Sequence, residues 1–370
     1  MKKILQLSKK ILTWSIIAPL LAWLLLWGMQ LGIKEALGPF YLPIMFAGLV
    51  GTVLAAVHHA EVVAHKLGEP FGTLLLTVAI TVIEVALILS LMLTGGPETA
   101  SLARDTVFAS VMIILSGIMG LCLLIGGVLY KEQVFQLHGV NVALSTLSAI
   151  VVLTLILPNY TTTSIGPMYS AGQLTFIALV SLVLYGTFIF VQIIRHRNYF
   201  LDTADADIYS LHDIKDDTST KVVFLSATLL LVCLVAVVLL AKSLAPSIEI
   251  LVASIGAPNQ LVGVIIASIV LLPEGLAAVY AARKNHFQTS LNLALGSALA
   301  TIGLTIPAVA ILSLIMGWTL IIGIDAKATV LLLLALFINA LSLSTGRTNI
   351  LQGTILLVIF GVYLFTTIIP

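Results

Sequence analysis

The sequence predicts an all-α polytopic membrane protein with about eleven transmembrane helices, arranged as one N-terminal helix followed by an inverted pair of five-helix repeats. Three observations support this fold class. Of 370 residues, 60% are hydrophobic and only 9% are charged, whereas a soluble domain is about 25% charged. Apolar runs without a charge recur along the chain, and such runs are read as membrane helices. A short motif occurs once in each half of the chain.

The composition also excludes several classes of protein. The net charge is +1 and no basic stripe with interleaved aromatic residues is present in the sequence, so we expect no nucleic-acid partner. Cys122 and Cys233 lie inside apolar runs, where they are expected to be small buried residues rather than a disulfide or a metal cluster. The sequence lacks the Gly-x4-Gly-Lys-Ser/Thr nucleotide-binding loop, which argues against an ATP-driven pump.

Apolar runs between charged or helix-breaking residues define the individual spans. The Lys-rich start imitates a signal peptide, but its apolar run continues to about Trp27 without a small-residue cleavage site, so an uncleaved helix is expected. The predicted spans are residues 11–32, 41–57, 72–94, 105–129, 141–158, 174–194, 221–241, 262–282, 291–316, 328–343 and 349–369. The second and seventh spans are expected to continue into amphipathic ends.

The distribution of Lys and Arg predicts the orientation, because cytoplasmic loops are enriched in these residues. With the N-terminus in the cytoplasm, thirteen of the 17 lie on that side. The other four are Lys34, Arg104, Lys242 and Lys327. We therefore expect a multi-pass protein of the cell inner membrane, with its N-terminus inside, its C-terminus outside and the lipid bilayer around it. The pattern makes no prediction of oligomeric state.

The repeated motif is a glutamate followed by an apolar-rich stretch and Gly-x-Pro. It occupies Glu61–Pro70 and again Glu249–Pro258. Each copy precedes a span with one internal glutamate, Glu84 in the third span and Glu274 in the eighth. Because five spans per copy is an odd number, the second copy must enter the membrane in the opposite orientation, as in many secondary transporters.

The repeat predicts how the chain is organised. The expected divisions are an N-terminal helix at 1–33, a first repeat at 41–194, a cytoplasmic linker at 195–220 and a second repeat at 221–370. The linker contains six aspartates at irregular spacing, which favours a solvated connection over a cation-sensing segment.

Glu84 and Glu274 are the strongest candidates for chemistry. Each lies about 12 residues into its span, roughly 18 Å along a helix that crosses a hydrocarbon core of about 30 Å. A carboxylate at that depth persists if it faces a cavity, binds a cation or takes a proton, and the last two exclude each other at one oxygen. For a single glutamate, a protonated helix–helix hydrogen bond is the alternative. Matched depth in two inverted copies favours a site where cation and proton compete, which suits Ca²⁺ or Na⁺.

Hydroxyl groups that could complete a cation shell lie near both glutamates. They are Thr77, Thr81, Ser110, Ser116, Ser297 and Thr301. Taken singly, each is also a common packing residue between membrane helices. Pro273, directly before Glu274, frees a backbone carbonyl in the preceding turn that could join the site.

A second constellation lies at the cytoplasmic end of the second span. His58, Glu61 and His65 fall at i, i+3 and i+7 on one helix face, with His59 beside them. This spacing could hold a transition metal. Because no matching ligands occur elsewhere in the sequence, we interpret the group as interface polarity with a role in proton entry or pH sensing.

In these motifs the chain resembles the cation/proton exchanger family of the calcium/cation antiporter superfamily, in particular its ChaA-type sodium/calcium:proton antiporters. The segments that carry the resemblance are 59–70, Leu272–Gly275, Leu295–Thr301 and Ser344–Asn349. The resemblance covers nearly the whole chain. It implies that the two repeats contribute one acidic residue each, Glu84 and Glu274, to a central cation site, with spans 4 and 9 opposite. It also implies alternating access through movement of an outer helix pair, which we expect to be spans 1 and 6.

The sequence departs from the family pattern beside both glutamates. Many calcium/proton exchangers carry Gly-Asn ahead of the repeat glutamate, where this chain has Ile80-Thr81 and Val270-Leu271. The His that often follows the second glutamate is Gly275. Two amides and one imidazole are therefore missing, so the site is expected to admit Na⁺ or K⁺ more readily than a strict Ca²⁺ site.

Together these expectations predict a secondary active antiporter, not an enzyme, that exchanges Na⁺ and/or Ca²⁺, with K⁺ as a further candidate, for protons. No cofactor is expected. Two other functions remain open. A passive cation channel could use the same carboxylates but would conduct without coupling to a pH gradient. An intramembrane metalloenzyme could use His58, Glu61 and His65.

Overall fold

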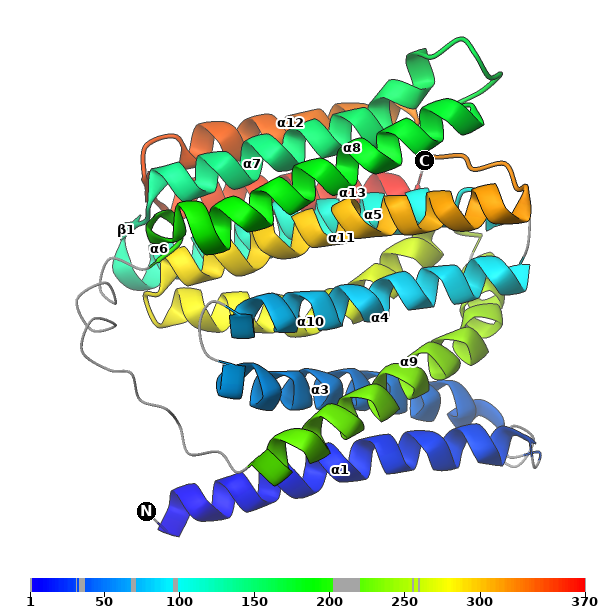
Figure 1. Cartoon of the computed structure of the whole chain (residues 1–370), viewed down its shortest axis with the longest axis vertical. Coiled ribbons are helices and arrows are strands. Elements are labelled where there is room, and N and C mark those ends of the chain that lie inside the picture. The colour runs from blue at the N-terminus through cyan, green and yellow to red at the C-terminus, as the bar shows by residue number, and fades with distance from the viewer. Residues whose placement is uncertain are drawn as a thin grey trace. The chain divides into compact units, whose positions relative to one another are not determined.

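Long helices make up most of the part of the chain that the structure describes (Figure 1). The computed structural model describes residues 2–30, 32, 37–67, 71–95, 99–201, 220–254, 256–258 and 260–369. Two short strands, β1 (Gln133–Val134) and β2 (Arg347–Thr348), pair antiparallel, with Gln133 opposite Thr348. The prediction of an all-α protein is confirmed apart from this small sheet.

The helices follow the predicted spans in order. In the first half they are α1 (Lys2–Gln30), η1 (Gly38–Phe40), α3 (Tyr41–Leu67), α4 (Phe71–Gly95), α5 (Leu102–Met112), η3 (Ile113–Ile118), α6 (Met119–Tyr130), α7 (Leu137–Val151), η4 (Val152–Ile156), η5 (Leu157–Tyr160), α8 (Ala171–Phe190), η6 (Val191–Arg195) and η7 (Arg197–Tyr199). In the second half they are α9 (Thr220–Ser254), α10 (Gln260–Arg283), α11 (Phe287–Met316), α12 (Ala326–Leu343) and α13 (Ile350–Ile368). The segments η3, η4 and η6 are π-helical.

The apolar helices of the described residues agree in position with the predicted spans. Among the described residues, nine helical segments are long and apolar enough to cross a membrane, and two shorter apolar stretches lie at Trp14–Met29 and Thr77–Leu93. All eleven coincide with predicted spans. As expected, α3 and α9 continue past residues 57 and 241. Helices suit a bilayer because they satisfy their backbone hydrogen bonds internally, where no water is available.

The Gly-x-Pro motif separates helices where the structure describes it. In the second copy, α9 ends at Ser254 and α10 begins at Gln260, with Gly256 at a φ of +69° between them. Glycine adopts this left-handed conformation without the steric cost that a side chain brings. The first copy's Gly-x-Pro, residues 68–70, lies outside the described residues, as does most of the predicted linker.

The chain divides into two compact units. Unit 1 comprises Met1–Leu91 and Ile214–Ile255, and so holds α1, α3, α9 and most of α4. Unit 2 comprises Met92–Asp213 and Gly256–Pro370, and so holds α5 to α8 and α10 to α13. Each unit therefore draws helices from both predicted repeats.

In unit 1, α3 packs against both α1 and α9. A glycine permits the approach of α1, since a Cβ atom at Gly48 would lie 2.9 Å from the side chain of Leu25. A buried polar contact fixes the same interface: the Nε2–H of His59 donates to the carbonyl oxygen of Ser15 at 3.1 Å. The side chain of His59 is 1% exposed, so this hydrogen bond replaces one that water would otherwise supply.

The expectation that spans 1 and 6 form one outer helix pair is wrong, because the two spans belong to different compact units. Span 6 is α8, which packs against α11 within unit 2, whereas the helices that pair in unit 1 are spans 2 and 7, α3 and α9. The error has a physical reason. Apolar spans carry hydrophobic side chains around their whole circumference, so hydropathy locates a span without indicating which helix it contacts.

Unit 2 contains a large cluster of buried hydrophobic residues. Its helix α10 packs against α5 and α11, while α6 packs against α13. The core includes side chains that are wholly buried, among them Val107, Leu115, Leu147, Leu299 and Leu356. Gly120 on α6 allows the close approach of α13, because a Cβ atom there would meet the backbone of Leu357 at 3.0 Å.

Contacts between the two predicted repeats in unit 2 occur in equivalent pairs. When a helix of the first repeat contacts one of the second, the corresponding helices with the repeats interchanged are also in contact. Span 4 (α5, η3 and α6) packs against span 11 (α13), and span 9 (α11) packs against span 6 (α8). The loops between these helices form contacts with the same reciprocal pattern. The loop after span 4 pairs with the loop after span 10 through β1 and β2. The loop after span 9 bonds to the end of span 5 and to the loop that follows it, because Ile324 N donates to Leu155 O and Gly323 N to Pro167 O, both at 2.9 Å. Two interlocked copies of one five-helix unit account for this reciprocity.

Candidate cation site

Glu274 lies near the middle of α10 and is buried. It is the fifteenth of the 24 residues of that helix and its side chain is 9% exposed. The hydroxyl of Ser297 on α11 donates to Glu274 Oε1, with the two oxygens 3.1 Å apart. Because α10 and α11 pack along each other, the carboxyl group of one helix meets the hydroxyl of the next inside unit 2. The sequence predicted both residues, and the structure brings them together.

Pro273 modifies the backbone of α10 next to this carboxyl group. A proline has no N–H, so the carbonyl of Ile269, four residues earlier, lacks its usual helical donor. Ile269 is itself buried, with 7% of its surface exposed. That this carbonyl oxygen, one turn before Glu274, joins a cation site as a hard-oxygen ligand stays a prediction.

The other predicted hydroxyls of unit 2 are buried on helices that contact α10. Thr301 lies one turn after Ser297 on α11 and is 1% exposed. Ser110 on α5 and Ser116 in η3 are wholly buried. Ser116 donates its hydroxyl hydrogen to Met112 O at 2.5 Å, so its lone pairs are what it can offer a cation.

Glu84 lies near the middle of α4, in unit 1. It is the fourteenth of 25 residues in that helix and is 2% exposed. Thr81, one turn earlier, is 3% exposed and donates its hydroxyl hydrogen to Thr77 O at 2.9 Å. The Thr77 side chain is half-buried. Both predicted glutamates are thus buried mid-helix, one in each compact unit.

The predicted histidine group is only partly described. His58 is half-buried and Glu61 is exposed on α3, whereas the side chain of His65 lies outside the described residues. His59, which the sequence pattern placed merely beside the group, is the buried member and holds α3 to α1. Among the described residues, no three His, Cys, Asp or Glu side chains are grouped as metal ligands.

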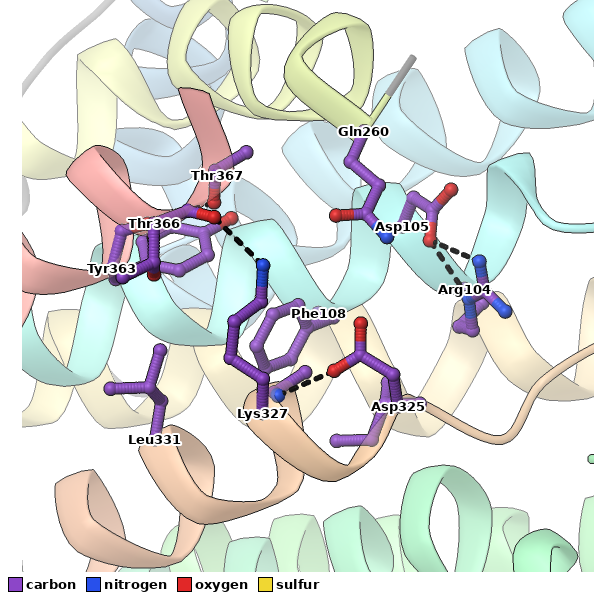
Figure 2. A pocket seen from close by; sticks show the side chains of 12 residues that line it. Arg104, Asp105, Phe108, Gln260, Asp325, Lys327, Leu331, Tyr363, Thr366 and Thr367 are labelled. Carbon is purple, nitrogen blue, oxygen red and sulfur yellow. Dashed lines mark hydrogen bonds and ion pairs between the residues drawn. The ribbon is translucent and has the colours of Figure 1, made fainter. Parts of the chain in front are cut away.

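A polar pocket of about 230 Å³ opens in unit 2 where several helices begin or end (Figure 2). Arg104 and Asp105 line it from the start of α5, with Gln260 from the start of α10. Arg104 donates from Nε and Nη2 to Asp105 Oδ1, each at 2.8 Å, and from Nη1 to Gly323 O at 3.3 Å. The ion pair therefore also anchors the loop that leads into α12.

The opposite wall of the pocket joins α12 to α13. Lys327 donates from Nζ to the carbonyl oxygen of Thr366 at 2.7 Å, near the C-terminal end of α13, where the helix dipole favours a cation. Asp325 accepts from Ala328 N at 2.6 Å and so caps the start of α12. The pocket is thus lined by two acidic and two basic side chains, which are equal in number and opposite in charge. Through their hydrogen bonds they hold the ends of these helices and the loop before α12.

This pocket was not predicted from the sequence. Arg104 and Lys327 served only as markers of orientation, and neither Asp105 nor Asp325 was singled out. The adjacent Arg104-Asp105 pair, at the start of an apolar span, was the available signal. Charged residues next to a span are common at membrane surfaces, however, so the pair alone did not indicate a shared pocket with the start of α12.

Comparisons with known proteins agree with this fold. The family model described as sodium/calcium exchanger protein matches residues 37–194 and 225–369. The chain is 46% identical over 329 residues, 88% of each protein, to y4hA of Sinorhizobium fredii, which is named as an ionic transporter. It is 34% identical over 356 residues, 95% of each protein, to the sodium-potassium/proton antiporter ChaA of Escherichia coli. The solved structure of the H⁺/Ca²⁺ exchanger CAX shares its fold, with a TM-score of 0.67 at 16% identity over 95% of this chain and 88% of that one.

Proposed function

The chain belongs to the sodium/calcium exchanger protein family, and on this premise we propose that it is a secondary active antiporter that exchanges Na⁺, K⁺ or Ca²⁺ for protons. The family assignment confirms the resemblance that the sequence motifs indicated. The E. coli relative is named a sodium-potassium/proton antiporter, and the relative from Aphanothece halophytica is named a Ca²⁺/H⁺ antiporter. Those names support cation/proton exchange as the shared activity.

One observation carries the mechanism: Glu274 is buried in the middle of a helix long enough to cross a membrane, with the Ser297 hydroxyl on one carboxyl oxygen. A charged carboxylate in such a place is costly, so it takes either a proton or a cation. One oxygen cannot hold both. Binding a cation therefore releases the proton, and binding a proton releases the cation, which is the coupling that an antiporter needs.

Glu84 supplies the second acidic residue in this proposal. It matches Glu274 in its position along the helix and in its burial. Two carboxylates carry two negative charges, which one Ca²⁺ or two protons neutralise. One Ca²⁺ can therefore replace two protons without leaving a buried net charge. In the proposed cycle each of the two carboxylates binds cation and proton by turns, and each is protonated when the cation has left.

The remaining ligands in the proposal are hydroxyl and backbone oxygens. Ser297, Thr301 and the Ile269 carbonyl lie on α10 and α11, and hard oxygen atoms of this kind suit Na⁺, K⁺ and Ca²⁺. In the second repeat, Leu271 and Gly275 replace the family's amide and imidazole and contribute no side-chain oxygen, and in the first repeat Thr81 offers a hydroxyl in place of an amide. We therefore propose that the site accepts Na⁺ and K⁺ and does not select Ca²⁺ strictly.

The proposed setting is the cell inner membrane, with the N-terminus in the cytoplasm and the C-terminus outside. The distribution of thirteen basic residues against four supports this orientation. A C-terminal fusion to a protein that fluoresces only in the cytoplasm should therefore stay dark. A bright fusion would reverse the orientation.

Proton release from acid-loaded everted membrane vesicles tests the function. Addition of Na⁺, K⁺ or Ca²⁺ should release protons from vesicles that contain the protein, and comparing the three ions gives the selectivity. The variants Glu84→Gln and Glu274→Gln keep the shape of the side chain but remove its charge, so each should reduce exchange to the level of vesicles without the protein. Glu132→Gln is a matched control, because Glu132 is exposed in the loop beside β1.

Two results would overturn the proposal. Normal exchange by either glutamate variant would remove that residue from the mechanism. Cation movement that proceeds without any proton movement would indicate a passive channel in place of an antiporter.

A further inference from the structure

The membrane span that crosses beside Glu274 contains one extra residue within its helix. In the π-helical segment η3, the N–H of Met119 donates to Ile114 O, five residues back. An α-helix would instead direct that N–H to Leu115 O, four residues back. The regular pattern resumes in α6, so the carbonyl of Leu115 is the one that the π-helical turn leaves without a donor from its own helix.

Asn339 of α12 supplies the donor for that carbonyl oxygen. Its Nδ2 donates to Leu115 O at 2.9 Å and to Ala335 O of its own helix at 2.8 Å. The side chain is wholly buried. Both amide hydrogens are used, and the reversed amide would place Oδ1 against two carbonyl oxygens, so the chemistry fixes which way the group points.

The same π-helical segment forms the surface against which the Glu274 region of α10 packs. Gly275, directly after Glu274, faces Ile118 so closely that a Cβ atom there would lie 3.2 Å from Ile118 Cδ1. On the side of α13, a Cβ atom at Gly117 would lie 3.4 Å from the ring of Phe360. The bulge therefore determines which side chains of this span meet the helix that carries the carboxyl group.

We propose that Asn339 is a positioning residue for the Glu274 site, acting through the π-helical turn and not as a ligand. Without its amide, Leu115 O would be a buried acceptor that lacks its donor, and the return of η3 to a regular α-helix would relieve it. That return moves the following residues by one position, about 100° around the helix axis. Ile118 would then leave Gly275, and the wall beside Glu274 would change shape.

This inference rests on the proposed function, because it assigns Asn339 to the site where cation and proton compete. It adds a residue on α12, a helix that the sequence pattern connected with neither glutamate. The polar side chain of Asn339 also has an explanation in these terms, since a leucine of similar size would fill the same space but could not donate to Leu115 O.

Two variants of nearly equal shape test the role. Asn339→Leu removes both donors at every pH, so the KM for Na⁺ or Ca²⁺ should rise about tenfold, the value expected for one lost buried hydrogen bond. Asn339→Asp can donate to Leu115 O only when its carboxyl group is protonated. Its KM, taken as a ratio to wild type at each pH, should be near one in acid and rise about tenfold in alkali.

Asn349→Asp is the matched control for the amide-to-carboxyl exchange. Asn349 caps the start of α13 at an exposed position, and aspartate caps as well as asparagine. Its KM ratio should stay near one throughout. Because the Asn339→Asp protein is compared with itself at two pH values, the result does not depend on how well Asn339→Leu inserts into the membrane.

The outcomes separate this inference from the proposed function. Wild-type KM values for Asn339→Leu, or a pH-independent ratio for Asn339→Asp, beside an inactive Glu274→Gln variant would reject the role of Asn339 alone. A Glu274→Gln variant that exchanges normally would reject the proposed site itself, and with it the positioning role of Asn339.

Discussion

The two glutamates occupy equivalent places in the sequence repeat, but their helices provide different surroundings. On α10, a proline precedes Glu274, a glycine follows it, and Ser297 of a neighbouring helix donates to its carboxyl group. On α4, Ile83 precedes Glu84 and Val85 follows it. The nearby Thr81 gives its hydroxyl hydrogen to its own helix backbone.

This difference shows what the duplication has preserved. Both copies retain a buried carboxyl group near the middle of a helix. The side chains and backbone oxygens that could surround a cation have diverged between the copies. We therefore expect changes beside Glu274 to alter cation affinity more than the matched changes beside Glu84. The comparison can be challenged by making matched changes on the two helices.

The largest difference is expected at the residue after each glutamate. Gly275→Val would place a branched side chain against Ile118, whose Cδ1 atom would lie only 3.2 Å from the new Cβ atom. Overpacking of this kind costs about 1–3 kcal/mol, so exchange should fall about tenfold or more in everted vesicles. The reciprocal change on α4, Val85→Gly, removes bulk and weakens the helix by about 0.5 kcal/mol, and it should reduce exchange only a few-fold.

Equal losses in these two variants would contradict the comparison, because they would mean that both glutamates lie against equally tight walls. Protein amounts in the vesicles need to be matched, since overpacking also lowers the amount of folded protein. Gly275→Ala provides an intermediate step, because its Cβ atom requires Ile118 to move by only a few tenths of an ångström.

A smaller difference is expected between the hydroxyls. Ser297→Ala removes the donor to Glu274, so the KM for the cation should rise about fivefold, corresponding to about 1 kcal/mol for one hydrogen bond. Thr81→Val keeps the shape of the side chain and removes a hydroxyl that is bonded to Thr77 O. Its KM should change by less than about twofold. Cation titrations of proton release measure both. A larger effect at Thr81 than at Ser297 would reverse the proposed asymmetry.

The sequence predicted the spans and the depth of the glutamates because the bilayer imposes both. A helix that crosses hydrocarbon must be apolar over a fixed length, so an apolar run such as that of α10 identifies a span in the sequence. An internal carboxylate such as Glu274 is then easily recognised, because charged residues are rare within such runs. The hydrogen bond between Ser297 and Glu274 could be anticipated for a related reason. Few polar side chains lie inside apolar spans, and those that do tend to form hydrogen bonds with one another.

Tertiary partners account for what the sequence did not predict. The π-helical turn before Met119 leaves no pattern in the apolar sequence around it, and Asn339 acquires its role only because α12 packs beside that turn. The incorrect pairing of spans 1 and 6 has the same origin, since hydropathy does not indicate neighbours. In the pocket, Lys327 was visible as a charge, but its acceptor, the carbonyl of Thr366, carries no sequence signal.

The central claim is that a proton and a cation compete for the same buried carboxylates. The most direct measurement is the KM for Na⁺, K⁺ or Ca²⁺ in everted vesicles over a series of fixed pH values, with no pH gradient at the start. Competition predicts that acid raises the KM, by up to about tenfold per pH unit for each proton that must leave, while the limiting rate at saturating cation stays constant. A KM that is independent of pH, with only the limiting rate changing, would contradict the account.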